Sequence, residues 1–72
     1  MQIDLHGFYL HQLPKKLDEI IVEALIRRSE EIKIITGQGP LQKEVIQLCQ
    51  SLYGYNAHVE LANPGVIIVE LF

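Results

Sequence analysis

The sequence has one cysteine and no long apolar run. Cys49 alone cannot form an internal disulfide, and no second thiol offers a zinc site, a usage that is typical of cytoplasmic proteins. The longest uninterrupted apolar runs, such as residues 66–69, are far shorter than the roughly 20 residues that span a bilayer. We therefore expect a cytoplasmic protein without a disulfide and without a membrane segment.

Positive charge is also scarce, because six Lys and Arg stand against nine Asp and Glu, for a net charge of −3. Nonspecific affinity for nucleic acid depends mainly on Lys and Arg, so this balance excludes a protein whose main task is to neutralise many phosphates. The chain is 49% hydrophobic and 21% charged, which excludes a disordered tail.

The length of 72 residues leaves room for one hydrophobic core, so we predict a single domain over residues 1–72. A domain this small buries only about 60% of its unfolded surface, and it depends on dense packing or on a partner. A homo-oligomer and a place in a larger parent protein both stay open.

Hydrophobic spacing predicts the element order β-α-β-α-β-β. Residues 2–5 alternate as a short strand that stops at Gly7, and residues 32–35 form a β-branched run between charged residues and glycines. Apolar residues three and four apart form a stripe from Leu10 to Leu25 and predict a helix that begins near residues 10–13 and ends around Ser29, with Pro14 in its first turn. A second helix should begin at Pro40 and stop at Gly54, and its apolar stripe extends to Leu52.

The last two elements read as an antiparallel hairpin. Residues 55–61 alternate with period two, with Leu61 on the apolar face, residues 63–65 (NPG) have turn chemistry, and residues 66–71 are strongly apolar. Right-handed crossovers make the first two strands parallel neighbours. We therefore predict a two-layer α/β domain, in which two helices pack on a mixed four-stranded sheet.

Two polar turns follow the first two strands, where ligands collect in parallel α/β units. Because these strands are predicted to be parallel neighbours, we expect the two turns to lie side by side. Asp4 and His6 are two residues apart on a strand, so their side chains should point the same way, and a carboxylate there can orient an imidazole for proton transfer. Each also has a structural interpretation, because Asp4 can cap a backbone turn and His6 can hydrogen-bond the turn at Gly7. Two aromatic residues follow this turn, Phe8 and Tyr9, and they could stack on an unpaired base or pack against the sheet.

The second turn is rich in glycine and precedes a helix. Gly37, Gln38 and Gly39 could receive a phosphate at the helix N-terminus, with Lys43 close by, or the glycines could serve only to turn the chain. Three scattered histidines do not show metal-ligand spacing, and one carboxylate is too few to define a site for a divalent metal. Any metal requirement is therefore open.

Three segments, in order, resemble the Smr (small MutS-related) domain family. Residues 3–7 (IDLHG) are similar to the LDLHG motif that opens these domains, and residues 36–39 (TGQG) are similar to their HGxG motif. Residues 63–71 (NPGVIIVEL) are similar to the closing pattern GxGVTxVxL. Either short motif alone is weak, but their order and spacing cover almost the whole chain.

This resemblance implies a fold like the C-terminal domain of translation initiation factor three, and a domain that nicks or binds DNA or RNA, often branched or structured. It places catalytic or substrate-contacting groups at Asp4 and His6. Thr36 stands where the family has histidine, Gln42 where it has arginine, and Ile67 where it has threonine.

Three functions follow as alternatives: a nicking endonuclease, a binding module of the same fold without turnover, and a protein-interaction or dimerisation module. The substitutions at Thr36 and Gln42 favour the second, and a mildly acidic surface favours the third.

Overall fold

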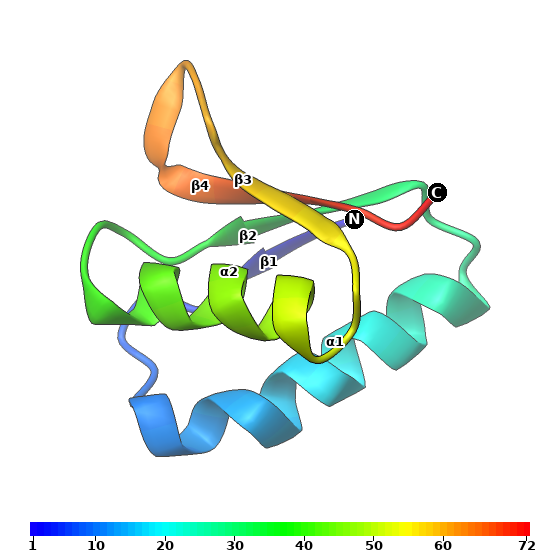
Figure 1. Cartoon of the computed structure of the whole chain (residues 1–72), viewed down its shortest axis with the longest axis horizontal. Helices are drawn as coiled ribbons and strands as arrows, with labels where there is room; N and C mark the ends of the chain where they lie inside the picture. Colours follow the sequence, from blue (N-terminus) through cyan, green and yellow to red (C-terminus); the bar gives the residue numbers. More distant parts are fainter.

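A computed structural model describes the whole chain, residues 1–72. The elements are β1 (Gln2–Asp4), a 3-10 turn η1 (Leu10–Gln12), α1 (Leu13–Ile26), β2 (Glu31–Ile35), α2 (Pro40–Ser51), β3 (Asn56–Glu60) and β4 (Asn63–Glu70). The sheet has the order β1-β2-β4-β3, in which β1 and β2 are parallel and the other neighbours antiparallel (Figure 1). The predicted mixed four-stranded sheet with two helices is confirmed, and β3 is an edge strand.

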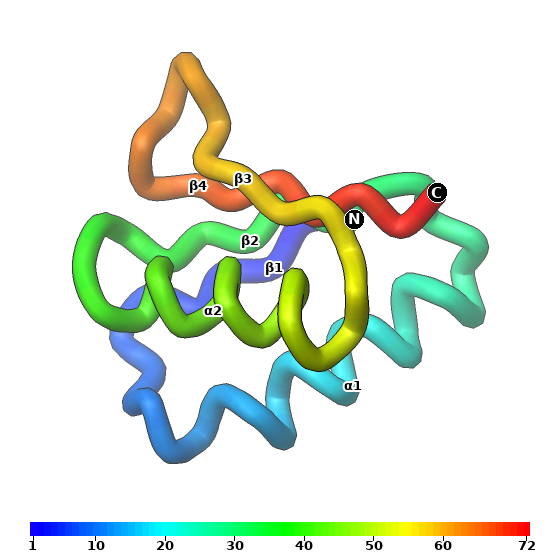
Figure 2. Tube along the Cα trace, viewed as in Figure 1, coloured from blue at the N-terminus to red at the C-terminus, as the bar shows by residue number.

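Both helices cover one face of the sheet and leave the other face without helices (Figures 1 and 2). The core lies between the two layers, and its members are the apolar residues that the helix and strand periodicities select. They include Leu13, Leu17, Ile20 and Ala24 of α1, Val45 and Cys49 of α2, and Ile32, Ile34, Ile67 and Val69 of the central strands. Each fully buried Leu, Ile or Val contributes about 1.5–3 kcal/mol of transfer free energy. Neither helix has the length and apolarity that crossing a bilayer requires.

Helix α1 ends at Ile26, earlier than the expected end around Ser29. Arg28 adopts a left-handed conformation with φ 57, its N–H donates to Leu25 O, and the N–H of Ser29 donates to Ala24 O at 2.9 Å. This pattern is a Schellman motif, which usually has glycine at the left-handed position. Because an arginine and not a glycine occupies that position, the sequence did not indicate where the helix ends.

The final hairpin turns at Leu61 and Ala62, and not at the predicted residues 63–65, which begin strand β4. Glu60 pairs with Asn63, and the register shifts between Val59 and Glu60. The shift makes the prediction of Leu61 on the apolar face wrong, because its side chain is fully exposed. Three residues assigned to the helix stripes are exposed as well, namely Leu10, Leu25 and Leu52.

Helix α2 begins at Pro40 as predicted, and Gly54 follows its end with φ 72. Cys49 lies on its buried face, and this burial raises the pKa of the Cys49 thiol to about 11. Cys49 is therefore a small core residue.

Candidate functional site

The turns that follow β1 and β2 lie side by side, as predicted from the parallel crossover. The N–H of Leu5 extends the ladder and donates to Ile35 O at 2.7 Å. A Cβ atom built on Gly37 would lie 3.2 Å from Cδ2 of the His6 ring. His6 therefore packs directly against the glycine loop.

The start of β4 is the third component of the site. The N–H groups of Thr36 and Gly37 both donate to Gly65 O at 3.0 Å, and a Cβ on Gly65 would lie 3.4 Å from Gly37 Cα. The side-chain amide of Gln42, in the first turn of α2, donates to Pro64 O at 2.6 Å. These bonds fix the glycine loop between β4 and α2, so His6 has a rigid surface beside it.

Sequence reasoning missed the positions of Gly65 and Gln42 in this site. The sequence indicates Gly65 only through the closing pattern, and Gln42 only as the residue in place of the family arginine. The signal for Gly65 lies in the third motif, because a glycine that is close to another backbone often serves that approach. No local pattern indicates the bond from Gln42 to Pro64 O.

Asp4 holds the backbone of the turn. Its Oδ1 accepts the backbone N–H of His6 at 2.9 Å, which confirms the capping alternative for Asp4. No hydrogen bond joins this carboxylate to the imidazole, and the side chain of His6 is exposed. The imidazole is thus free to meet a ligand that approaches the loop.

The glycine loop leads into the N-terminus of α2. Gly37 and Gly39 have φ values of 71 and 139, so the turn interpretation of both glycines is confirmed. The N–H groups of Leu41 and Gln42 belong to the first helical turn, which has no preceding carbonyls to pair with them. These N–H groups and the positive end of the helix dipole favour the binding of an anion at this position.

Around this loop, Gln38 and Lys43 are exposed, and Lys43 forms no ion pair. Thr36 differs, since only 6% of it is exposed and its hydroxyl donates to Gly37 O at 2.8 Å. Thr36 therefore supplies no donor to the surface of the site.

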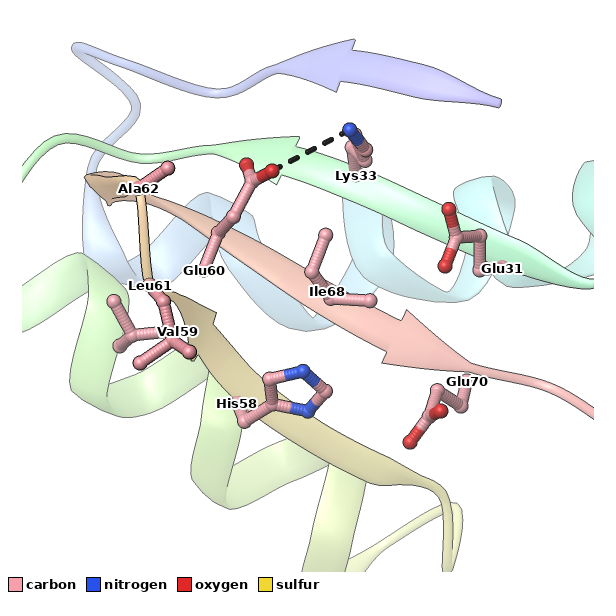
Figure 3. A pocket seen from close by; sticks show the side chains of 9 residues that line it. All are labelled: Glu31, Lys33, His58, Val59, Glu60, Leu61, Ala62, Ile68 and Glu70. Atoms are coloured by element: carbon pink, nitrogen blue, oxygen red, sulfur yellow. Dashed lines mark ion pairs between the residues drawn. The ribbon is translucent and has the colours of Figure 1, made fainter.

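The largest hollow of the molecule lies away from these loops, on the helix-free face of the sheet (Figure 3). Its volume is about 770 Å³, and three carboxylates, Glu31, Glu60 and Glu70, surround it. Lys33 is the one lysine or arginine there, and it pairs with Glu60 at 3.5 Å. The excess of negative charge makes this hollow a poor place for a phosphate, so we assign the candidate site to the loops.

No group of three or more His, Cys, Asp or Glu side chains is arranged to hold a metal ion. No solved structure matches the chain, so the resemblance to the C-terminal domain of translation initiation factor three stays a prediction.

Comparison with known proteins identifies a relative and a family. Endonuclease NBR9 of Saccharomyces cerevisiae is 28% identical over 78 aligned positions, which cover 97% of this chain. The match covers 32% of that relative, so the chain spans about a third of its length. The Smr domain family model matches residues 3–71, nearly the whole chain. The same residues carry the strand-end histidine, the glycine loop and the closing strand, and the chain belongs to the Smr domain family.

Proposed function

We propose that this domain binds DNA or RNA and cleaves a phosphodiester bond at the His6 turn and the glycine loop, as a nicking endonuclease of the Smr type. The observation that carries the proposal is the contact of the exposed His6 ring with Gly37, in the loop that opens onto the N-terminus of α2. Membership of the Smr family and a relative named an endonuclease support it.

The residues of the site have distinct roles in this proposal. The N–H groups of Leu41 and Gln42 bind the phosphate, and Lys43 adds one positive charge. A water oxygen bonds to phosphorus while the bond from phosphorus to one sugar oxygen breaks, and the water proton ends on the leaving oxygen. His6 takes the proton from the water or gives one to the leaving oxygen, because imidazole is the side chain most often used for this step. Asp4 positions His6 through the backbone of the turn.

A second candidate is a binding module without turnover, and one observation favours it. The side chains that stand in place of the family histidine and arginine are both engaged inside the protein, Thr36 with Gly37 O and Gln42 with Pro64 O. Neither adds a positive charge that would stabilise a phosphorane-like transition state.

Nicking of supercoiled plasmid and cleavage of a structured RNA, each with Mg²⁺ and with EDTA, test the proposal. We expect His6→Ala to lower the cleavage rate about a hundredfold or more. The circular dichroism spectrum should not change, because the exposed imidazole leaves no core cavity. Lys43→Ala should mainly weaken binding, since it removes one screened charge.

Arg27→Gln is the matched control, because Arg27 is an exposed cation at the far end of α1. Cleavage by folded His6→Ala at the parent rate would contradict the enzymatic role. If neither protein cleaves and both bind branched nucleic acid equally, the binding module is the correct function.

A further inference from the structure

An aromatic pair stands in solvent next to the His6 turn. Tyr9 is 68% exposed, and its ring stacks on that of His11, with centroids 5.7 Å apart and planes 8° from parallel. Tyr9 follows His6 by three residues, which span at most about 11 Å of chain. The pair is therefore close to the candidate site.

The rings of this pair form no hydrogen bond and are not among the residues that pack on the core. Turn η1 is held by two bonds between Tyr9 and Gln12, from Gln12 N–H to Tyr9 O at 3.0 Å and from Tyr9 N–H to Gln12 Oε1 at 2.9 Å. Neither bond uses the Tyr9 ring. Phe8, by contrast, is half-buried and packs on the core, so packing is confirmed for Phe8 but not for Tyr9.

A second stacked pair shows what a structural pair looks like in this chain. Tyr53 and Tyr55 have centroids 6.3 Å apart and are 9° from parallel, but both are partly buried and pack against the core. The hydroxyl of Tyr53 also donates to Asp18 at 3.1 Å. Tyr9 and His11 lack such burial, so the stability of the fold does not account for them.

Lysines stand beside the exposed pair. A hollow of about 330 Å³ is lined by Phe8, His11, Gln12, Lys15, Lys16 and Glu19. Lys15 forms no ion pair, and Lys16 makes only a long one, at 3.9 Å, with Glu19. Lys15 and Lys16 lie in the first turn of α1 and Lys43 in that of α2, and both helices begin at the end of the molecule where β1 and β2 finish (Figures 1 and 2).

We propose that Tyr9 and His11 form a stacking surface for an unpaired base, and that Lys15 and Lys16 contact the phosphates next to it. This inference rests on the proposed function, and it names a single-stranded segment beside the reacting bond as the substrate. Bases in a duplex are stacked on one another, whereas an unpaired base can lie on an aromatic ring. The stacking surface does not distinguish one base from another, because every base has a π-face.

Fluorescence anisotropy with 12-nucleotide oligouridine and oligothymidine tests the stacking surface. The same strands with abasic sites are the comparison probes. Tyr9→Ala should weaken binding about fivefold or more, the lower end of base stacking on an aromatic side chain. Tyr9→Phe should bind like the parent, because it keeps the ring. On the abasic strands Tyr9→Ala and the parent should bind equally. Phe72→Ala is the control, since it removes an 81% exposed ring from the C-terminus.

The lysines are tested by the salt dependence of binding. The double variant Lys15→Gln, Lys16→Gln should reduce the slope of log K against log salt by about 1.4, at about 0.7 per phosphate of a single strand. Arg27→Gln, at the other end of the same helix, should leave the slope unchanged.

The outcomes separate this inference from the proposed function. If the parent binds no single-stranded, duplex or branched probe, the proposed function fails and the stacking surface fails with it. If the parent binds but Tyr9→Ala has the parent affinity, or loses as much on abasic strands as on intact ones, the stacking surface alone is refuted.

Discussion

Replacing Gly37 by alanine should disturb the site more than it disturbs the fold. Gly37 has φ 71, a conformation that costs an L residue about 1–2 kcal/mol. The new Cβ would lie 3.2 Å from His6 Cδ2, a separation that forces the ring to move. Because the His6 side chain is exposed, it can turn into solvent at little cost. We therefore expect the loss of stability to come almost entirely from the backbone.

Gly54 offers a matched control for the backbone cost. It has φ 72, nearly the value of Gly37, but a Cβ built there meets no atom within 4 Å. Both alanine variants should lose about 1–2 kcal/mol in urea denaturation, which for a domain of this size lowers Tm by about 4–16 °C. Only Gly37→Ala should move the His6 ring resonances in an NMR spectrum and reduce nucleic-acid cleavage or binding.

Two results would refute this reasoning. If Gly37→Ala is much less stable than Gly54→Ala, the His6 ring cannot move away and the contact is part of the core packing. If Gly37→Ala leaves both the His6 resonances and the nucleic-acid activity at the parent values, the glycine does not position the histidine.

Three further predictions concern the loop bond, the core and the salt dependence. Gln42→Ala should weaken nucleic-acid binding and speed hydrogen exchange of the Gly37 N–H, because Pro64 O loses its donor, and parent exchange rates would contradict this. Burial raises the pKa of the Cys49 thiol from its ordinary 9.0 to about 11, so the folded state holds this proton more tightly. The contribution of Cys49 to stability should therefore be constant below pH 9 and be lost from pH 9 to pH 11. Urea denaturation across this range checks it, and an equal fall in Cys49→Ala would refute it. Binding should show a shallow salt slope, since three lysines flank the loops, and a slope equivalent to six or more phosphates would contradict the assigned surface.

The sequence predicted the order of the elements and the meeting of the two loops because both follow from short-range rules. Alternation in the strands and spacings of three and four residues in the helices place the apolar residues, and the handedness of parallel crossovers places the ends of β1 and β2 together. Pro40 and Gly54 marked the two ends of α2 by backbone chemistry alone.

The misplaced hairpin turn shows where such rules fail. Residues 63–65 have the chemistry of a turn, and proline is disfavoured inside a central strand. Pro64 is accommodated because it lies beside the register shift and before the first pair of β4 with β2, Val66 with Ile35. Gly65 is needed there to approach Gly37, a contact between distant segments that a local pattern does not show.

The proposed function requires an acidic domain to bind nucleic acid, and the distribution of charge is compatible with this requirement. On the helix-free sheet face, Glu31, Glu60 and Glu70 outnumber Lys33, so a phosphate backbone is repelled from that face. Lys15, Lys16 and Lys43 lie instead in the first turns of the two helices, where the dipoles add to their positive field. With few cations in all, long-range attraction is weak, and short-range contacts at the loop end must supply most of the affinity. Such a domain would bind little to ordinary duplex and would favour sites where a base is free to stack.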